Sequence, residues 1–204
     1  RFAEAMTLAG ESGLEVDTLH FHIGSGYLGD ALDVLDRVLE RVGSMQDAYP
    51  QIRTLNVGGG LGLRLTEADR AIDTGRWAAI IGMHARRRGL RVQIEPGDYL
   101  VKDAGALLVR VNTVEDKAGV RFVGVDAGLG IQNLPAYYQT PFIVAPLQRA
   151  AGAPLERVTI AGNINEAIDL VAEDVELPAV AEGDLLALLN AGGYGSAAAS
   201  NHCM

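Results

Sequence analysis

One short segment organises the chain, and it reads Val92-Gln93-Ile94-Glu95-Pro96-Gly97-Asp98. The β-branched residues Val92 and Ile94 predict a short buried strand, and Pro96-Gly97 forces the chain to turn directly after it. Glu95 is therefore expected at the carboxyl end of a strand, where the loops of β/α barrels form their active sites. Taken by itself, this stretch favours a simpler interpretation, in which the carboxylate faces solvent before a turn.

Two earlier segments repeat the arrangement of a strand followed by an unusual loop and a helix. The predicted strands cover residues 19–23, 52–57 and 92–94, and helices are expected at 1–13, from about 30, and at about 67–88. Such consecutive βα units predict a parallel sheet. A doubly wound sheet uses mainly one switch point, whereas a β/α barrel uses every loop at one face. Distinctive residues after all three strands therefore favour the barrel, with a buried carboxylate, Glu95, at its rim.

The pattern changes after residue 104. Short β-type runs follow one another without a helix of comparable length, at residues 107–111, 122–125, 141–146, 158–161 and 185–189. This pattern predicts a second, mainly antiparallel β domain. We therefore predict an α/β protein made of the C-terminal half of a β/α (TIM-type) barrel, residues 1–104, followed by a β domain, residues 105–204.

The composition excludes several classes of function. The 204 residues carry a formal charge of −9 and are 49% hydrophobic, which is typical of a globular protein with a sizeable core. The one basic cluster, Arg86-Arg87-Arg88, suits the end of a helix and argues for no nucleic-acid partner. The single cysteine, Cys203, excludes an internal disulfide framework. The sequence has no membrane-length apolar run and no signal-peptide pattern, so a cytoplasmic protein is expected.

Two loops suggest a phosphate site. Gly58-Gly59-Gly60 follows a strand, and such loops bring backbone N–H groups close to a bound phosphate. The run is not a dinucleotide fingerprint, because Leu63 occupies the third glycine position; a plain tight turn is the alternative. His22 could be a core histidine, but Gly24-Ser25-Gly26 follows it as a second donor-rich loop. Together with Glu95, these features predict a site for a phosphorylated, aromatic, nitrogenous cofactor.

Neither a metal site nor a serine hydrolase has support in the sequence. The histidines show no ligand spacing with cysteine or paired carboxylates, and they are His20, His22, His84 and His202. A nucleophile elbow for a Ser-His-Asp hydrolase is also missing. We therefore expect no metal.

Six motifs in order resemble the pyridoxal-phosphate-dependent decarboxylases with an alanine-racemase-like barrel, such as the diaminopimelate and ornithine decarboxylases. The motifs are Phe21-His22-Ile23-Gly24-Ser25, Gly58-Gly59-Gly60, Glu95-Pro96-Gly97, Val125-Asp126-Ala127-Gly128, Gly162-Asn163-Ile164-Asn165-Glu166 and Gly192-Gly193-Tyr194-Gly195. They extend over residues 21–195, so the resemblance covers nearly the whole chain.

This resemblance implies a cofactor, a reaction and a role for each residue. The cofactor would be pyridoxal 5'-phosphate and the reaction the decarboxylation of an amino acid or an amino-acid conjugate. The implied cofactor contacts are stacking by His22, phosphate binding by Ser25, Gly58, Gly59, Gly60, Gly97 and Tyr194, and pairing of Glu95 with the ring nitrogen. Glu95, His22 and Asn165 would be catalytic, and Asp98, Asp126 and Glu166 would face the substrate. Loops around Asn165 would reach the partner's site in a homodimer.

Departures from the family pattern concern the substrate and the cofactor lysine. The lysine that carries the cofactor in this family has no counterpart here, which predicts a fragment that lacks the N-terminal half-barrel. Asp98 replaces a usual arginine, Asn165 a cysteine, Leu134 a substrate-binding arginine and Ala167 a serine. A guanidinium is the natural partner of a carboxylate, so the substrate is predicted not to be diaminopimelate. A role in secondary metabolism, for example in siderophore synthesis, would fit such variant loops.

Three other functions compete with decarboxylation. A racemase of the same barrel type would prefer an arginine at the ring nitrogen, so Glu95 favours decarboxylation. A non-catalytic homologue that binds another protein would lack the cofactor lysine in its full-length sequence. A barrel that binds only a sugar phosphate would leave Glu95 and Tyr194 without a role.

Overall fold

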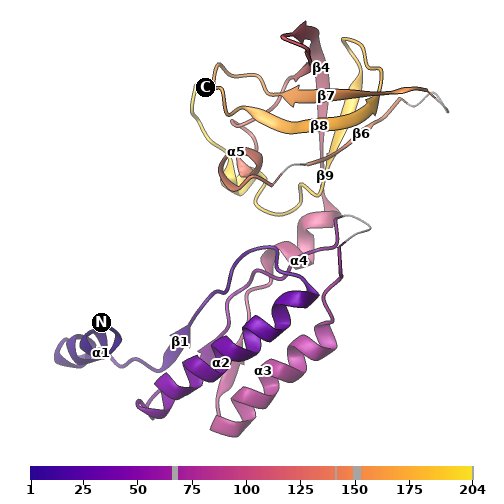
Figure 1. Cartoon of the computed structure of the whole chain (residues 1–204). Helices are drawn as coiled ribbons and strands as arrows, with labels where there is room; N and C mark the ends of the chain where they lie inside the picture. The colour runs from indigo at the N-terminus through magenta and orange to yellow at the C-terminus, as the bar shows by residue number, and fades with distance from the viewer. Residues whose placement is uncertain (66–68, 141, 149–152, 204) are drawn as a thin grey trace. The chain divides into compact units, whose positions relative to one another are not determined.

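The computed structural model describes residues 1–65, 69–140, 142–148 and 153–203, and the chain divides into two compact units, Arg1–Tyr99 and Leu100–Met204 (Figure 1). This division falls a few residues before the boundary expected at residue 104. The first unit contains a parallel sheet and the second a mainly antiparallel sheet, so the predicted fold class is confirmed. In the described part of the chain, no helix is both long and apolar enough to span a membrane.

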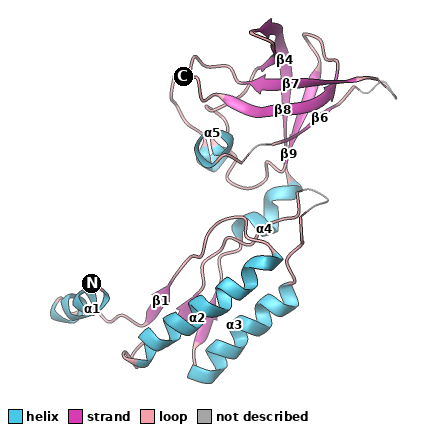
Figure 2. Ribbon diagram, in the orientation of Figure 1, coloured by secondary structure: helices cyan, strands magenta, loops and turns pink. Residues whose placement is uncertain are grey.

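The first unit contains a three-stranded parallel sheet in the order β1-β2-β3 (Figure 2). The strands are β1 (Thr18–His20), β2 (Thr54–Asn56) and β3 (Arg91–Gln93). The first two are shorter than predicted, and β3 has the predicted length but begins one residue earlier. The helices are α1 (Phe2–Glu11), the 3₁₀ turn η1 (Gly29–Ala31), α2 (Leu32–Asp47) and α3 (Thr74–Arg88). Because α2 joins β1 to β2 and α3 joins β2 to β3, the unit consists of consecutive βα units.

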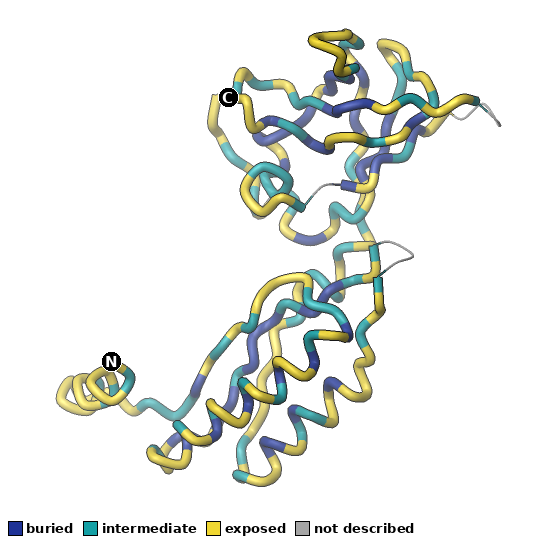
Figure 3. The backbone as a smooth tube through the Cα atoms, viewed as in Figure 1, coloured by how far each residue is buried: buried dark blue, intermediate teal, exposed yellow. Residues whose placement is uncertain are grey.

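Apolar side chains at helical spacing hold α2 and α3 on this sheet. Leu32, Leu35 and Leu39 of α2 are each 1% exposed and cluster with Trp77 and Ile81 of α3. Figure 3 shows buried and exposed segments alternating along both helices. Burying a leucine side chain stabilises a fold by roughly 1.5–3 kcal/mol. The amphipathic pattern in the sequence therefore identified the face that packs on the strands.

The helix α3 begins later than predicted. The predicted start at residue 67 lies outside the described residues, and residues 69–73 are not helical. The Asp73 side chain accepts a hydrogen bond from the Arg76 backbone N–H across 2.9 Å, so it caps the helix that starts at Thr74. At the other end, Gly89 has φ 64°, a left-handed conformation that ends the helix.

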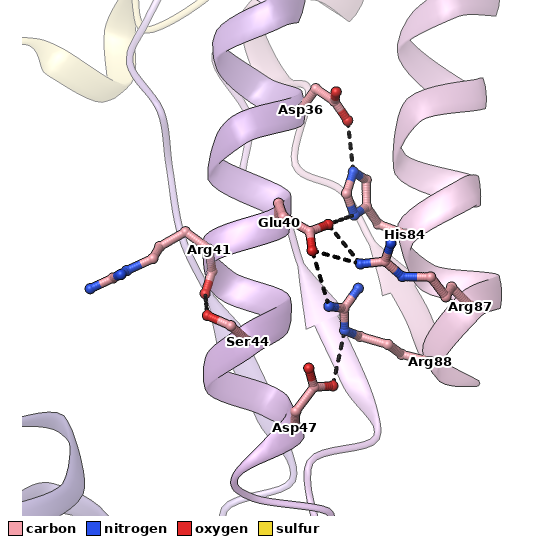
Figure 4. Close-up of polar contacts among 8 residues, drawn as sticks. All are labelled: Asp36, Glu40, Arg41, Ser44, Asp47, His84, Arg87 and Arg88. Carbon is pink, nitrogen blue, oxygen red and sulfur yellow. Dashed lines mark hydrogen bonds and ion pairs between the residues drawn. The ribbon is translucent and has the colours of Figure 1, made fainter.

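Charged and polar side chains connect α2 to α3 (Figure 4). The His84 side chain is only 5% exposed, and its Nε2 lies 2.7 Å from Oδ1 of Asp36. The ion pairs between the helices include Arg87 with Glu40 at 2.6 Å and Arg88 with Asp47 at 3.2 Å. Two arginines of the basic cluster thus pair with carboxylates of α2, in keeping with the expectation that the cluster is structural.

The predicted burial of the β3 segment is wrong. Val92 and Ile94 are 40% and 47% exposed, and the Glu95 side chain is 55% exposed. The reason is that β3 pairs with β2 on one side only; no other strand in the described part of the chain pairs with its free edge. Glu95 therefore occupies the predicted strand end as a partly exposed carboxylate.

The second unit contains a six-stranded sheet in the order β6-β9-β4-β5-β7-β8. Its strands are β4 (Ala106–Lys117), β5 (Val120–Val125), β6 (Ile143–Pro146), β7 (Leu155–Ala161), β8 (Leu170–Pro178) and β9 (Leu185–Leu189). All neighbours are antiparallel except β5 and β7. The outer strands β6 and β8 also contact each other, so the sheet curls towards a barrel.

The other short helical segments are α4 (Gly97–Val101), which spans the boundary between the units, and η2 (Lys102–Ala104), α5 (Leu134–Tyr138) and η3 (Ser196–Ala198) of the second unit. The predicted run 141–146 corresponds to β6, although residue 141 lies outside the described residues. No strand was predicted at the position of β8. The core of this unit includes Val123, Val125, Ile160 and Leu186, each 0% exposed.

Candidate functional site

The loops after β1, β2 and β3 meet at one edge of the parallel sheet. Carboxyl ends of parallel strands lie at the same edge, and hydrogen bonds connect the loops there. The Gly59 N–H donates to Nδ1 of His22 across 3.3 Å, and the Glu95 N–H donates to the Gly58 carbonyl across 2.8 Å. The structure therefore brings together His22, the glycine run and Glu95.

Asn56, which the sequence analysis missed, connects two of these elements. Its Nδ2 donates to Oε1 of Glu95 across 2.7 Å, and its Oδ1 accepts the Gly58 N–H across 2.9 Å. His20 Nε2 lies 3.9 Å from the same carboxylate oxygen. Asn56 could have been found in the sequence, because it is a polar residue at the end of β2. Glu95 was predicted from the same kind of position, at the end of a strand.

The glycine run fits a group that approaches the backbone closely. Gly58 and Gly60 have φ 67° and 89°, and a Cβ added at Gly58 would lie 2.6 Å from the Phe21 carbonyl oxygen. A Cβ at Gly59 would overlap the Glu95 carbonyl oxygen, and one at Gly60 that of Gly24. Side chains are thus excluded where the loops touch. A bare backbone beside an imidazole and a carboxylate suits the phosphorylated, nitrogenous cofactor predicted from the sequence.

The other predicted cofactor residues lie as follows. Ser25 is exposed between Gly24 and Gly26, and Gly97 begins α4, where its N–H donates to the Glu95 carbonyl across 2.8 Å. Asp98 follows in the first turn of α4. Tyr194 belongs to the second unit and is 59% exposed.

Tyr27 contacts the glycine loop. The Tyr27 N–H donates to the Gly60 carbonyl across 2.9 Å, and the indole N–H of Trp77 donates to the Tyr27 hydroxyl across 3.1 Å. Burial raises the pKa of Tyr27 above its usual value, and the hydrogen bond from Trp77 acts in the opposite direction. The glycine loop is thereby connected to the apolar core of the first unit.

In the second unit, a buried carboxylate holds two of the predicted substrate loops. Asp169 is 4% exposed; its Oδ1 accepts the Leu129 N–H across 2.7 Å and its Oδ2 the Ile164 N–H across 2.9 Å. A Cβ on Gly128 or Gly162 would overlap this carboxylate, so both positions need glycine. Asp169 was not predicted from the sequence, because its partners are backbone N–H groups, which have no sequence signature, and one of them, that of Leu129, is 40 residues away.

Two of the predicted substrate residues, Asp126 and Glu166, belong to the same unit as this carboxylate, whereas Asp98 belongs to the first unit. Asp126 Oδ1 accepts the Arg110 N–H across 2.8 Å, and the Asn163 side chain donates to the Asp126 carbonyl across 3.2 Å. Asn165 is exposed, and Glu166 Oε1 lies 2.7 Å from Nε2 of His202. The loop that carries residues 163–166 is thus fixed next to the segment that begins at Asp126.

Comparison with known proteins adds independent information. Residues 1–102 match the model of the pyridoxal binding domain of pyridoxal-dependent decarboxylases, and residues 98–192 match the model of their C-terminal sheet domain. The chain is 34% identical over 215 residues to a diaminopimelate decarboxylase of Methanothermobacter thermautotrophicus, an alignment that covers 98% of this chain and 49% of that protein.

Solved structures give similar coverage. A crystal structure of a diaminopimelate decarboxylase aligns with a TM-score of 0.86 and 27% identity over 98% of this chain and 51% of the other. The Helicobacter pylori diaminopimelate decarboxylase complexed with L-lysine aligns with a TM-score of 0.79 and 28% identity, covering 98% and 50%. The chain spans about half the length of the relatives it matches.

Proposed function

This chain belongs to the pyridoxal-dependent decarboxylase family, and from that premise we propose that the complete protein releases the carboxyl group of an amino acid or amino-acid conjugate as carbon dioxide. One observation carries the proposal: the Glu95 carboxylate is held by Asn56 at the sheet edge where His22 and Gly58 also lie. A fixed anion, a flat ring and a bare backbone loop suit the three parts of pyridoxal phosphate.

Each part of the cofactor has a proposed binding residue. His22 stacks on the ring, and the phosphate contacts Ser25, Gly58, Gly59, Gly60, Gly97 and Tyr194. Glu95 pairs with the ring nitrogen. When bound, pyridoxal phosphate supplies an electron sink for the electrons that remain after carbon dioxide leaves. A carboxylate beside the ring nitrogen holds a proton there, which improves that sink.

The hydrogen bonds of the site assign atoms to these roles. Asn56 holds Oε1 of Glu95, so we assign Oε2 to the ring nitrogen. Nδ1 of His22 accepts the Gly59 N–H, so in this arrangement the imidazole proton lies on Nε2. A neutral imidazole can stack on a protonated pyridine ring without charge repulsion.

We assign pyridoxal binding to the first unit and substrate and subunit contacts to the second. Asp126 and Glu166 face the substrate in this assignment. The loop around Asn165 reaches the site of a partner subunit, so the complete protein is a homodimer with shared active sites. The Asp169 contacts support this assignment, because they give the loop a fixed conformation.

The residue differences favour a substrate other than diaminopimelate. Asp98, Leu134, Asn165 and Ala167 replace residues that are usual in diaminopimelate decarboxylases, and two of the replaced residues are arginines. An amino-acid conjugate of secondary metabolism, such as a siderophore precursor, is our preferred class. Diaminopimelate is the second candidate, since the relatives compared above are diaminopimelate decarboxylases.

The experiment that tests the proposal uses the complete protein with added pyridoxal phosphate. Carbon dioxide release is measured from a panel of amino acids and conjugates, and bound cofactor is followed by its visible absorption before and after borohydride. Cofactor binding without carbon dioxide release from any substrate would contradict the decarboxylase assignment. Loss of optical activity from a chiral amino acid, without release of carbon dioxide, would instead identify a racemase.

A further inference from the structure

Three side chains of different chemistry lie close together in the second unit. Two of them are adjacent in the sequence, and the third is more than 30 residues earlier. Glu166, His202 and Cys203 each place one donor atom within 4.8 Å of the other two. The closest pair is Oε1 of Glu166 and Nε2 of His202, at 2.7 Å. We propose that these three residues bind Zn²⁺.

The loop that carries Glu166 has a fixed conformation. The buried Asp169 accepts the Ile164 N–H through Oδ2 across 2.9 Å, and its own N–H donates to the Glu166 carbonyl across 3.0 Å. These bonds hold the backbone on both sides of the Glu166 side chain. The carboxylate is therefore presented from a defined position, while the side chain itself remains 39% exposed.

The segment that carries the other two donors is attached to the same region. The Ser200 N–H donates to the Gly130 carbonyl across 3.0 Å, and the His202 N–H donates to the Ser200 hydroxyl across 3.1 Å. Gly130 follows Leu129, whose N–H donates to Asp169 Oδ1 across 2.7 Å. Both donor-bearing segments thus depend on one buried carboxylate, which reduces the conformational entropy lost when a cation binds.

The donor set and its spacing suit zinc. Tetrahedral zinc with bonds of about 2.0–2.3 Å to oxygen, nitrogen and sulfur separates its ligands by roughly 3.3–3.7 Å. The separations here extend from 2.7 Å up to at most 4.8 Å, so shifts of about 1 Å by the side chains would bring the three donors to these separations. A water molecule would supply the fourth ligand. A thiolate and an imidazole select against Mg²⁺ and Ca²⁺, which prefer oxygen ligands.

When zinc is bound, the Glu166 carboxylate would not be available to contact the substrate. This consequence rests on the proposed function, in which Glu166 faces the substrate, whereas binding itself does not. A cation bound to the Glu166 carboxylate competes for the same oxygen atoms, so Zn²⁺ should inhibit decarboxylation. The site would then act as an inhibitory switch that responds to free zinc.

The test uses the complete, chelator-treated protein and Zn²⁺ alone as the probe. Zinc affinity is measured by competition with a chromophoric chelator for wild type, His202→Ala, Cys203→Ser and the control Glu173→Gln, an exposed carboxylate of the same unit. We expect each of the first two substitutions to weaken zinc binding at least about tenfold and the control to leave it unchanged. Equal affinity in all four proteins would overturn the proposal.

A second measurement avoids any dependence on folding of the variants. Alkylation of Cys203 in the wild type is followed by peptide mass mapping with and without Zn²⁺. Zinc should slow the reaction at least about tenfold, and Mg²⁺ at the same concentration should not. An alkylation rate unaffected by Zn²⁺ would also overturn the site. If zinc protects Cys203 but no substrate loses carbon dioxide, the site stands and only the proposed function fails.

Discussion

The side-chain amide of Asn56 donates to Oε1 of Glu95 across 2.7 Å while its own carbonyl oxygen accepts the Gly58 N–H across 2.9 Å. One side chain therefore joins the end of β2, the glycine run and the carboxylate after β3. Both ends of the amide are satisfied, which fixes its orientation. Asn56 is thus a positioning residue for Glu95. Its replacement should change the position of the carboxylate without removing the negative charge.

The first prediction concerns Glu95 itself. Glu95→Gln in the complete protein should leave pyridoxal phosphate bound but lower kcat, because the neutral amide does not hold a proton on the ring nitrogen. Removing one preorganised electrostatic group costs on the order of 2–4 kcal/mol, or roughly 30-fold to 1000-fold in rate. Cofactor absorbance and kcat are measured together. An unchanged kcat would remove Glu95 from the mechanism.

The second prediction separates position from charge at Asn56. Asn56→Ala removes two hydrogen bonds, each worth about 0.5–1.5 kcal/mol, so kcat should fall by roughly tenfold while the cofactor still binds. Asn56→Asp keeps the acceptor for Gly58 but places a second carboxylate beside Glu95, so it should lower kcat further. Steady-state kinetics of both variants provide the comparison. If the aspartate variant is the more active, Asn56 does not act through Glu95.

The third prediction concerns the buried Asp169. Asp169→Asn keeps the shape but places an NH₂ group against one backbone N–H, so it should lower the free energy of unfolding by about 1.5–3 kcal/mol. Urea denaturation of the complete protein measures the change, with Glu173→Gln as the exposed control. Equal stability of the variant and wild type would show that the carboxylate does not hold these loops.

The fourth prediction concerns pH. The pKa of the Tyr27 phenol is raised in the folded state, so its protonated form is favoured there. The resulting stability is fully present below the unfolded pKa of about 10 and is lost as pH rises through the higher folded value. The urea midpoint should therefore decrease less from pH 8 to pH 11 in Tyr27→Phe than in wild type. Identical falls would assign the alkaline loss to other groups.

The fifth prediction concerns the substrate. A distal carboxylate of diaminopimelate would meet Leu134 and Asp98 where arginines are usual, and an unpaired buried charge costs roughly 2–5 kcal/mol. We therefore expect kcat/KM for meso-diaminopimelate to be at least about a hundredfold below that of the true substrate. The test measures kcat/KM for meso-diaminopimelate, lysine, ornithine, arginine and citryl-type amino-acid conjugates, with carbon dioxide release as the readout. Diaminopimelate as the best substrate would show that the argument from lost arginines is wrong.

Local patterns predicted the elements of the first unit well. The apolar spacing of α2 and the strand-loop-helix order depend on residues near each other in the chain. The sequence could not predict the exposure of Val92 and Ile94, because burial of a strand depends on whether another strand pairs with its free edge. Similarly, the bond between Asn56 and Glu95 spans 39 residues and has no local signature.

The missed strand β8 has a specific physical cause. Its burial pattern is two buried residues, Val171 and Ala172, followed by two exposed ones, Glu173 and Asp174, so the two-residue period is interrupted. Asp174 has φ 54°, and the register with β7 shifts between Val158 and Ile160. An irregular strand hides the alternation on which sequence prediction depends.

The place of β4 in its sheet leaves one of its edges unpaired for part of the protein's synthesis. β4 pairs with its neighbour in sequence, β5, on one side and with the distant strand β9 on the other. At roughly 5–20 residues per second, the ribosome needs on the order of ten seconds to reach β9 after finishing β4. During that interval the edge of β4 at Leu107 and Val109 has no partner strand. This edge of the nascent chain is therefore open to pairing with another chain until Leu185–Leu189 has emerged.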